Sequence, residues 1–553
     1  MFCLDDGNEL LYGPATVDTN ATALLHDTSP AADAVTLLNI RPTDGPADGV
    51  STRESATWIM PSRPSVRGES ERSIAVLPFR NISLDTADEY FSDGLTEEII
   101  SDLSAVRSLK VISRASSMKL KGADKDSRTI AVELNVRFIL DGSVRKAGDQ
   151  LRISAQLIDG MTDENLWAEK YSGTLNDVFE IQESVSRSIV DALKITLSTE
   201  EEERLGERPI ENPYAYDLYL RARAEFVKGN PEALDRAIEL LGKGLDIIGD
   251  NELILASLGY AHYHYFRWIS KLDRGHLTQA AEYMRRTFDF NPSASHGHVL
   301  KGLLAYSDGD MGETLRSLKR ALEIEPTNTE ALFWYAVNLN YVGLCEEAGQ
   351  YADRLCEIDP LLPINVAIKA IRYVYTGGLD QALVWIEKSL SMEADSPLLV
   401  WTAAIIEAWA GEKEKAIVYF DRLAEIVPGW IYTEHGLFQK YAMLGEKELA
   451  LEHNLPEMAE EARYDCHFAL HMAECFALIG ESDTAFEYLT VAVEGGIVNR
   501  GFLSDYDLYL STLKSDERFG ALIDRAGELR EAILAELEVK GCNAARSADE
   551  NMT

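Results

Sequence analysis

The sequence predicts an α+β multidomain protein in which a small α/β domain precedes an all-α superhelix of helical hairpins. Three prolines predict the superhelix, because Pro292, Pro326 and Pro360 are 34 residues apart and each follows an amphipathic helical segment. The α/β domain is predicted over residues 73–200, where short β-branched runs alternate with segments of helical period. Since one hairpin cannot bury its own apolar face, repeats at this spacing stack into a continuous core.

Composition divides the chain further. Residues 1–72 are rich in Ala, Thr, Asp, Pro and Ser and keep neither a strand nor a helix period, so we expect a mostly disordered lead-in. Four consecutive glutamates at 200–203 mark a solvated junction, because like charges in a run are costly to bury. The other predicted segments are the α/β domain at 73–200, a linker at 201–212, about eight repeats at 213–500, capping helices at 501–540 and a loose tail at 541–553.

The hydrophobic pattern predicts each element of the α/β domain. The strands are expected at Ser73–Phe79 and Lys110–Ser113, and in a hairpin of Val136–Arg145 and Gln150–Asp159; the helices are expected at Asp88–Leu103, near 128–134 and at Leu175–Leu197. Acidic residues crowd the start of the first helix, where the helix dipole favours them. Gly148 supplies the positive φ that the hairpin turn needs.

Four strings in this region resemble a known family. They are Ile74–Phe79, Glu89–Ile100, Leu140–Arg145 and the stretch from Gln156–Asp159 through Leu166–Glu169. Together they closely resemble the TolB-amino-terminal-like domain of bacterial multidomain regulators. The resemblance implies a domain between an effector module and a tetratricopeptide array, the effector often being a class III adenylate cyclase, a winged-helix DNA-binding domain or a serine/threonine kinase.

The chain departs from that pattern where an activity would lie. Residues 1–72 are too few and too irregular to resemble any of these effectors. The sequence has no glycine-rich phosphate loop, no paired metal-binding aspartates on strands and no basic recognition helix. We therefore expect no enzymatic activity and no cofactor. The alternative is a truncated relative of a class III adenylate cyclase, whose catalytic domain is missing or miscalled.

Two columns of small residues set the register of the repeats. The first column lies twelve residues before the prolines and consists of Ala237, Ala280, Thr314, Ala348, Ala382, Ala416, Ala450 and, one residue late, Ala485. The second lies eight places into each first helix and consists of Gly259, Gly302, Ala336, Ala370, Ala404 and Ala473, with Glu225 and Phe438 as exceptions. Small residues are required where two helices approach closely. Eight units result, with a nine-residue insertion around Trp268–His276, and they resemble tetratricopeptide repeats.

Charge narrows the choice of partner. Acidic residues outnumber basic ones by 92 to 53, which gives a formal net charge of −39, and most of the excess lies beyond residue 200. Such a field repels phosphate backbones, so we expect no direct contact with nucleic acid. The acidic exterior of the repeats is interpreted as a solvated face, with attraction of a basic partner as the alternative.

The cysteines and the amino terminus indicate the cytoplasm. The six cysteines are Cys3, Cys345, Cys356, Cys466, Cys475 and Cys542. They form no C-x-x-C pair and fit reduced thiols. The first residues lack a basic segment followed by an apolar one, and the sequence has no run of about 18 apolar residues, so we predict neither export nor a membrane span. The oligomeric state is not predicted.

We predict that a protein or peptide binds in the concave groove of the repeats. In tetratricopeptide arrays, the resemblance implies that the second, fifth, ninth, twelfth and thirteenth places of each unit face inward. These places hold Tyr263, His264, His296, Tyr306, Phe333, Asn340, Tyr341, Tyr375, Trp401, Trp409, Tyr432 and His435. Aromatic anchors dominate recognition surfaces, although the same rings also suit the seams between hairpins. The expected ligand is an apolar segment, with a basic flank to match the acidic exterior.

One cluster of potential metal ligands has two interpretations, a metal site and ordinary helix packing. Cys466 precedes His467, His471 and Cys475, and the latter three share one helical face at i, i+4 and i+8. No fourth ligand is fixed by spacing and the His-Glu-x-x-His order is absent, so we favour helix packing and predict no metal site.

These observations favour a non-catalytic cytosolic regulator or scaffold in bacterial signalling or transcriptional control. A third hypothesis is transcriptional control without DNA contact, exerted through another regulator. If the groove binds the partner, alanine at Tyr341, Trp401 and Trp409 should weaken capture and leave the helical signal largely intact.

Overall fold

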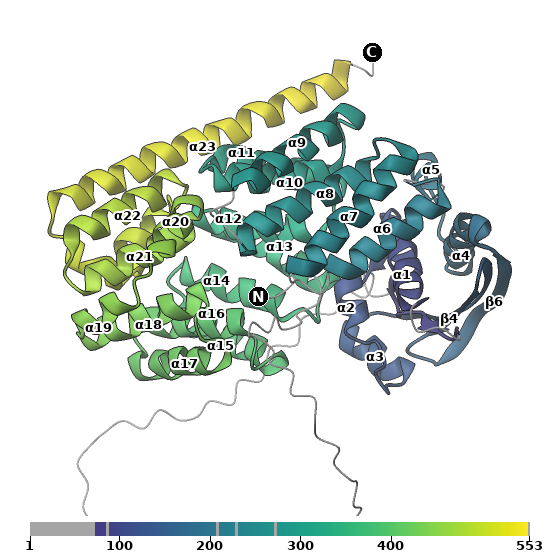
Figure 1. Ribbon diagram of the computed structural model, residues 1–553, viewed down its shortest axis with the longest axis horizontal. Helices are drawn as coiled ribbons and strands as arrows, with labels where there is room; N and C mark the ends of the chain where they lie inside the picture. Colours follow the sequence, from purple (N-terminus) through teal and green to yellow (C-terminus); the bar gives the residue numbers. More distant parts are fainter. Residues whose placement is uncertain (1–71, 84–87, 206–209, 227–230, 270–273, 551–553) are drawn as a thin grey trace, which may run out of the picture. The chain divides into compact units, whose positions relative to one another are not determined.

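The computed structural model describes residues 72–83, 88–205, 210–226, 231–269 and 274–550 (Figure 1). The lead-in predicted for residues 1–72 lies outside them apart from its last residue. The described chain is mostly helical: a small mixed sheet lies between residues 73 and 174, and an array of helical repeats follows it. This confirms the predicted combination of a small sheet-containing domain and an all-α array.

The sheet combines parallel and antiparallel strands in the order β3-β1-β4-β5-β6, with β2 also pairing with β4. Its strands are β1 (Ser73–Val76), β2 (Arg80–Asn81), β3 (Lys110–Val111), β4 (Phe138–Ala147), β5 (Gln150–Asp159) and β6 (Glu164–Thr174). Strand β1 is parallel to β3 and to β4, whereas β4, β5 and β6 form an antiparallel meander.

The predicted hairpin is present, and a strand that the sequence analysis missed extends it. Ala147 pairs with Gln150 across a turn in which Gly148 has a φ of +59°. Strand β6 escaped prediction because most of its side chains are exposed and polar. Only Trp167 and Tyr171 are partly buried against the core, so no clear alternation marks this edge strand.

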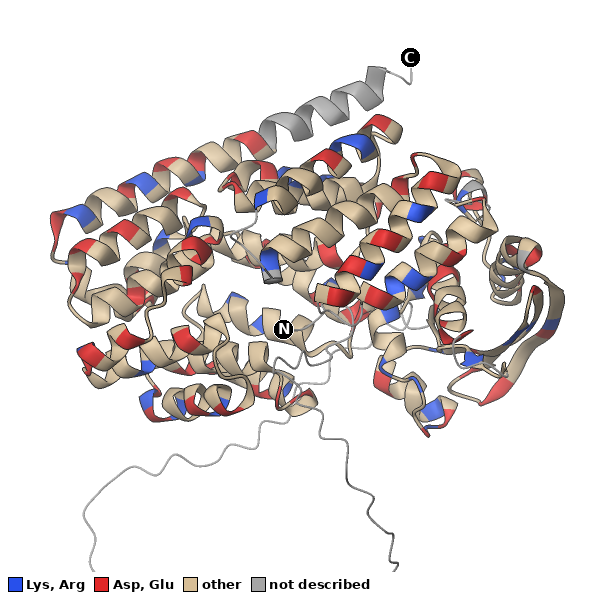
Figure 2. Cartoon of the chain, viewed as in Figure 1, with Lys and Arg blue, Asp and Glu red and all other residues tan. Residues whose placement is uncertain are grey.

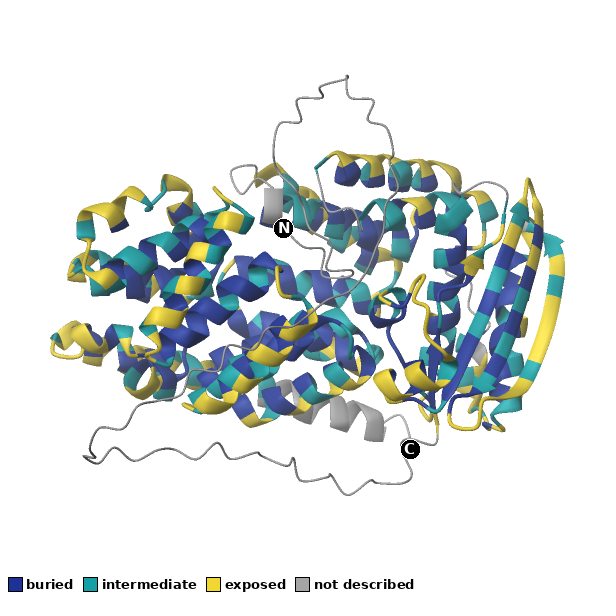
Figure 3. Ribbon diagram, turned by 90° about the horizontal axis from the view of Figure 1, so that it is seen from below, coloured by how far each residue is buried: buried dark blue, intermediate teal, exposed yellow. Residues whose placement is uncertain are grey.

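Helices cover the two faces of the sheet unequally. Helices α1 (Glu89–Ser104) and α4 (Val178–Ala192) bury their apolar stripes against one face, as Leu95, Ile99 and Val185 illustrate. The opposite face is covered by α2 (Arg114–Met118) and α3 (Ser127–Leu134) only near β1, β3 and the start of β4. The rest of β4, with β5, alternates between buried and more exposed residues, and β6 forms a largely exposed edge (Figure 3).

Eight helix pairs form the repeat array in the described residues. Short elements η2 (Leu175–Asp177) and α5 (Thr199–Arg204) precede it. The pairs are α6 (Pro213–Phe226) with α7 (Pro231–Ile248), α8 (Glu252–His264) with α9 (Arg274–Phe290), α10 (Ser295–Ser307) with α11 (Met311–Ile324), α12 (Thr329–Tyr341) with α13 (Cys345–Ile358), α14 (Pro363–Val374) with α15 (Leu379–Met392), α16 (Pro397–Trp409) with α17 (Lys413–Ile426), α18 (Ile431–Leu444) with α19 (Lys447–Glu452) and α20 (Pro456–Tyr464), and α21 (Cys466–Leu478) with α22 (Ser482–Glu494).

Glycine recurs at the turn inside the hairpins. Gly309, Gly343, Gly377, Gly411 and Gly445 follow the first helices of successive units, and their φ values lie between +74° and +79°. Glycine adopts this left-handed conformation without a Cβ clash, which is why it ends helices so often. These glycines form a third column with the 34-residue spacing, in addition to the two columns of small residues.

The second column of small residues, eight places into each first helix, lies where helices approach closely, as predicted. A Cβ added to Gly302 would lie 3.0 Å from the Leu318 Cγ, and one added to Gly259 would lie 2.3 Å from a methyl group of Leu300. At the equivalent place in the seventh unit, Phe438 is fully buried. The second helix of that same unit is divided into α19 and α20.

The insertion and the carboxy-terminal region add elements outside the repeat pattern. The insertion continues α8 as the π-helix η3 (Tyr265–Ile269), and its residues 270–273 lie outside the described part of the chain. After α22 come η4 (Phe502–Tyr506), η5 (Tyr509–Leu513) and α23 (Glu517–Glu550). Helix α23 lies along α11 and α22 (Figure 1). It continues to Glu550, whereas the sequence suggests a loose tail from 541.

Candidate functional site

The twelve predicted groove residues fall into two groups. Nine are buried, each at most 7% exposed: Tyr263, Tyr306, Asn340, Tyr341, Tyr375, Trp401, Trp409, Tyr432 and His435. The other three, His264, His296 and Phe333, are partly exposed and line one pocket. Binding by the buried group stays a prediction, and it would require the interior to open first.

The first helix of the last repeat fills the inner face of the preceding units. Trp409 Nε1 donates to Glu474 Oε1 at 3.0 Å, and the Tyr306 hydroxyl donates to Asp465 Oδ1 at 2.7 Å. Tyr341 stacks on His467 with ring centroids 5.4 Å apart. Glu474 and His467 belong to α21, and Asp465 caps its amino terminus. The aromatic rings therefore occupy a polar, hydrogen-bonded interior and not an open groove.

The π-helix η3, which leads into the predicted insertion at Trp268–His276, supplies a cation to this interior. Arg267 of η3 contacts Glu461 Oε1 at 2.7 Å and Asp465 Oδ2 at 2.5 Å, and all three side chains are at most 7% exposed. Tyr432 also donates its hydroxyl to Glu461 Oε1 at 3.3 Å. The second repeat is thus joined to the seventh and eighth by a buried ion-pair cluster.

The candidate metal ligands Cys466, His467, His471 and Cys475 lie in the same interior. His435 Nε2 is 3.7 Å from Cys475 Sγ, and His467 packs edge-on against His471. Burial lowers the pKa of both His467 and His471 to about 3, so both imidazoles are neutral at physiological pH. Within the described residues, no group of three or more His, Cys, Asp or Glu is arranged to hold a metal ion.

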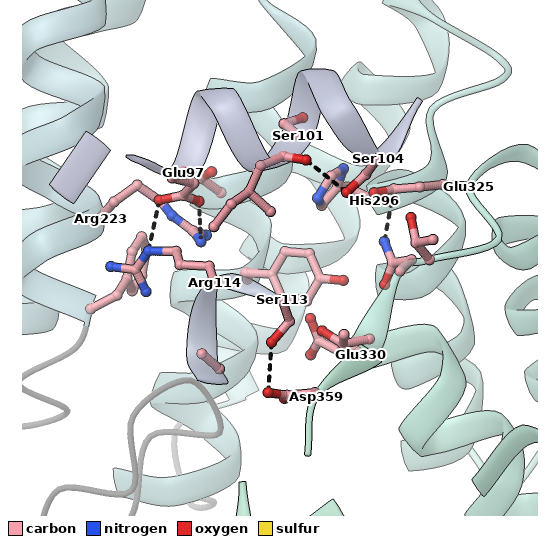
Figure 4. Close-up of a pocket in the computed structure, with 18 of the residues that line it drawn as sticks. Glu97, Ser101, Ser104, Ser113, Arg114, Arg223, His296, Glu325, Glu330 and Asp359 are labelled. Atoms are coloured by element: carbon pink, nitrogen blue, oxygen red, sulfur yellow. Dashed lines mark hydrogen bonds and ion pairs between the residues drawn. The ribbon is translucent and has the colours of Figure 1, made fainter. Parts of the chain in front are cut away.

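A pocket of about 380 Å³ lies between the α/β domain and the first five repeats (Figure 4). One wall comes from α1 and α2, which contribute Glu97, Glu98 and Arg114. The others come mainly from the first helices of the repeats and the loops beside them, with Leu234 of α7 and Ile358 of α13. Its apolar lining combines aliphatic side chains with four aromatic rings, those of Tyr219, Phe226, Tyr260 and Phe333. We call this cavity the junction pocket. Its size is in the range that accepts a small ligand or a few side chains.

An Arg–Glu–Arg cluster forms one side of the junction pocket. Glu97 contacts Arg114 Nε at 3.0 Å and Arg223 NH2 at 2.8 Å, and Figure 4 shows the three side chains together. Burial would raise the pKa of Glu97, but the two guanidinium groups outweigh it and lower the pKa. Glu97 is therefore ionised, and both arginines already have a carboxylate partner.

The remaining carboxylates give the pocket an acidic character. Glu98, Glu325, Glu330 and Asp359 line it. Burial, followed by repulsion from Glu97 and Asp102, raises the pKa of Glu98 to about 8. Within the described residues, no cationic side chain lies within ion-pair distance of Glu98. A carboxyl group held partly protonated beside aromatic walls gains from a cation that enters the pocket.

Asp359 joins the α/β domain to the repeats beneath the pocket. Its Oδ1 accepts hydrogen bonds from the Ser113 hydroxyl at 2.6 Å and from the Ser116 hydroxyl at 2.5 Å, and its Oδ2 accepts from Asn365 Nδ2 at 2.9 Å. Asp359 is 1% exposed, so these bonds satisfy a buried carboxylate. This junction could not be predicted from the sequence, because Ser113 and Ser116 lie more than 240 residues from Asp359 in the chain.

Two comparisons with known proteins match parts of the chain. Residues 70–188 match a family model described as the second domain of HilA/YgeH-like transcriptional regulators. The resemblance to the TolB-amino-terminal-like domain stays a prediction. A protein of Rhizobium meliloti (strain 1021) named "Putative adenylate cyclase 3" is 40% identical over 244 residues, which are 44% of this chain and 41% of that protein. The chain thus spans about two-fifths of the length of this relative.

Solved repeat structures resemble the array only distantly. A tetratricopeptide repeat protein from Parabacteroides merdae has a TM-score of 0.33 at 15% identity, over 51% of this chain and 99% of that one. A monomeric mutant of IFIT1 with Gppp-AAAA has a TM-score of 0.36 at 14% identity, over 64% of this chain and 88% of that one. None of the described helices is long and apolar enough to cross a membrane.

Proposed function

We propose that this protein is a non-catalytic regulator that holds a protein partner, and that the partner inserts a basic side chain with apolar neighbours into the junction pocket. The observation that carries the proposal is the lining of that pocket between two domains. There Glu98, which has no cation within ion-pair distance among the described residues, shares the lining with the rings of Tyr219, Phe226, Tyr260 and Phe333. A ligand there touches the α/β domain and the repeats at once. Its binding is therefore coupled to the way in which the two are joined.

Transcriptional control is the regulatory role that the family match supports best, since that match covers the α/β domain. With a net charge of −39, the chain is poorly suited to bind DNA itself, so we propose that it acts through another regulator. The cyclase-named relative supports the alternative of a cyclase-linked protein. Purified protein incubated with ATP and Mg²⁺ or Mn²⁺ separates the two, because cyclic AMP above a heat-killed control would overturn a non-catalytic role.

The pocket itself is tested with small peptides and the full chain. Acetyl-Leu-Arg-Leu-amide should bind, by ligand-observed NMR, and acetyl-Leu-Gln-Leu-amide should not. Since the raised pKa of Glu98 leaves its carboxyl group largely protonated below about pH 7, binding of the arginine peptide should strengthen as pH rises toward 9. The other titratable or charged side chains of the lining include Glu97, Arg114, Arg223, His264, His296, Glu325, Glu330 and Asp359, and Asp102 lies near Glu98.

Glu98→Gln is the matched variant, because it keeps the shape of the side chain and removes its titration. It should flatten the rise of binding with pH, and Glu448→Gln on the exposed face of α19 should not change it. Equal binding of both peptides by the unaltered chain would contradict a cation site in the pocket.

A further inference from the structure

A group of exposed basic side chains lies on the part of the sheet that none of the described helices covers. Arg145 of β4 and Arg152 of β5 are direct cross-strand partners. Lys170 of β6 pairs with Ser154, two residues along β5 from Arg152. Because cross-strand partners point to the same side, all three cations share one face, opposite the face that packs on α1 and α4. We call Arg145, Arg152 and Lys170 the basic sheet face.

These cations have no ion-pair partner among the residues that the structure describes. In the described part of the chain, no carboxylate lies within 4.0 Å of Arg145, Arg152 or Lys170, and each of the three is exposed. The contrast is Arg80 on β2, which pairs with Asp141 at 3.6 Å. Elsewhere the exposed cations of the repeats are commonly paired, as Lys243 is with Glu239. A stretch of positive charge is therefore set apart in a chain whose net charge is −39.

Placing Arg145 directly opposite Arg152 lowers the stability of the sheet. A face that only contacts water gains nothing from such a pair. Like charges directly opposite each other on an antiparallel pair are destabilising. Solvent faces usually mix the two signs, whereas the immediate neighbours of these cations are Ser143, Ser154 and Ser172; the carboxylate of Asp141, farther along β4 on the same face, is paired with Arg80. Their hydroxyl groups can donate hydrogen bonds to an anion. A carboxylate placed between Arg145 and Arg152 would remove the repulsion and gain charge-assisted hydrogen bonds.

The chemistry of the face favours a protein carboxylate over a nucleic acid. Single-stranded nucleic acids bind sheets through aromatic rings that stack on bases. Here Trp167 and Tyr171, the rings of β6, pair with Leu157 and Ile153 and so lie on the helical side of the sheet. The negative field of the whole chain also repels a long phosphate backbone more than it repels a short acidic segment.

We infer that the basic sheet face is a second interaction surface, and that it binds an acidic segment of a partner protein. Guanidinium groups on two neighbouring strands match carboxylates carried by an extended segment laid across them. This inference does not depend on the junction pocket, which attracts the opposite charge.

The test uses the full chain and a fluorescein-labelled peptide of alternating glutamate and serine, followed by fluorescence anisotropy. The double variant Arg145→Ser with Arg152→Ser should bind the peptide roughly tenfold more weakly, and added salt should weaken binding of the unaltered chain. The matched control removes two exposed cations from the repeats, Lys243→Ser with Arg320→Ser, and should bind as the unaltered chain does. A reversed variant, Arg145→Glu with Lys170→Glu, should prefer a lysine–serine peptide.

Three results would overturn the inference. Unchanged peptide binding in the Arg145/Arg152 variant would place the acidic ligand elsewhere. Tighter binding of single-stranded or duplex DNA, lost in the same variant, would make the face a nucleic-acid surface. Self-association of the unaltered chain in sedimentation, abolished by the variant, would make a second copy the occupant.

Discussion

Arg267 NH2 lies 2.5 Å from Asp465 Oδ2, although the two residues are 198 positions apart in the sequence. The contact joins η3 of the second repeat to the start of α21 in the last repeat. Its third member, Glu461, is on α20. Ordinary repeats contact only their neighbours, so this long-range cluster makes the array closed and more cooperative than a simple stack.

Removing Arg267 should therefore be far more destructive than removing an exposed arginine. Arg267→Met leaves two carboxylates buried without a cation, which should lower the free energy of unfolding by about 3–5 kcal/mol. Arg285→Met is the control, since the ion pairs of Arg285 are with surface acids, and it should leave the free energy of unfolding nearly unchanged. Urea titration followed by circular dichroism measures both. Equal, small effects would mean that the array is not closed in solution.

Substitutions of the predicted groove residues test whether each ring packs in the core or binds a partner. Trp409→Ala should cost about 3–5 kcal/mol, because the ring is buried and its indole N–H satisfies Glu474. Phe333→Ala in the junction pocket should cost less, since that ring is partly exposed, and should instead weaken binding of the arginine peptide. A Trp409→Ala variant with an unaltered melting curve and lost partner binding would restore the groove hypothesis.

The sequence could predict much of this fold because its strongest signals are local and periodic. Prolines, small residues and turn glycines recur every 34 positions, since each unit must solve the same packing problem. The sequence does not indicate which of the inward-facing positions of the first helices stay accessible. That depends on where α21 lies after the twist of all eight units has accumulated. Arg267 gave no signal for a similar reason: a cation beside an insertion resembles any surface residue until its distant carboxylates are known.

Overpacking tests the repeat register. Gly302→Leu and Ala404→Leu each place a large side chain where two helices approach, and each should lower stability by about 1–3 kcal/mol. Gly520→Leu is the control, because a Cβ there meets open space. Thermal melting of the three variants gives the comparison, and unchanged curves for the first two would show that the register is wrong.

A buried carboxyl pair should make stability fall as pH rises. Burial raises the pKa of Glu474 from 4.5 to about 8 and also raises the pKa of Asp507, its neighbour. Because the folded pKa of Glu474 lies above the unfolded value, its favourable contribution is complete below about pH 4.5 and is lost as pH approaches 8. Glu474→Gln should reduce this loss and so melt relatively higher at alkaline pH. Since Glu98 and Asp102 titrate in the same range, the measured quantity is the difference between variant and unaltered chain. Parallel curves for the two proteins would contradict the assignment.

A substitution in the basic sheet face should stabilise the protein, whereas most substitutions destabilise it. Arg145→Gln removes one member of a cross-strand pair of like charges, so it should stabilise the α/β domain by up to about 1 kcal/mol at low salt. The gain should shrink at high salt, because screening weakens the same repulsion in the unaltered chain. Lys125→Gln is the control with the opposite sign, since Lys125 pairs with Glu133 and its loss removes a weak attraction. Differential scanning calorimetry at two ionic strengths measures both variants. If Arg145→Gln is stabilised and no longer binds the glutamate–serine peptide, the repulsion is retained for binding. If Arg145→Gln is destabilised, Arg145 has a structural partner and the face is not a ligand site.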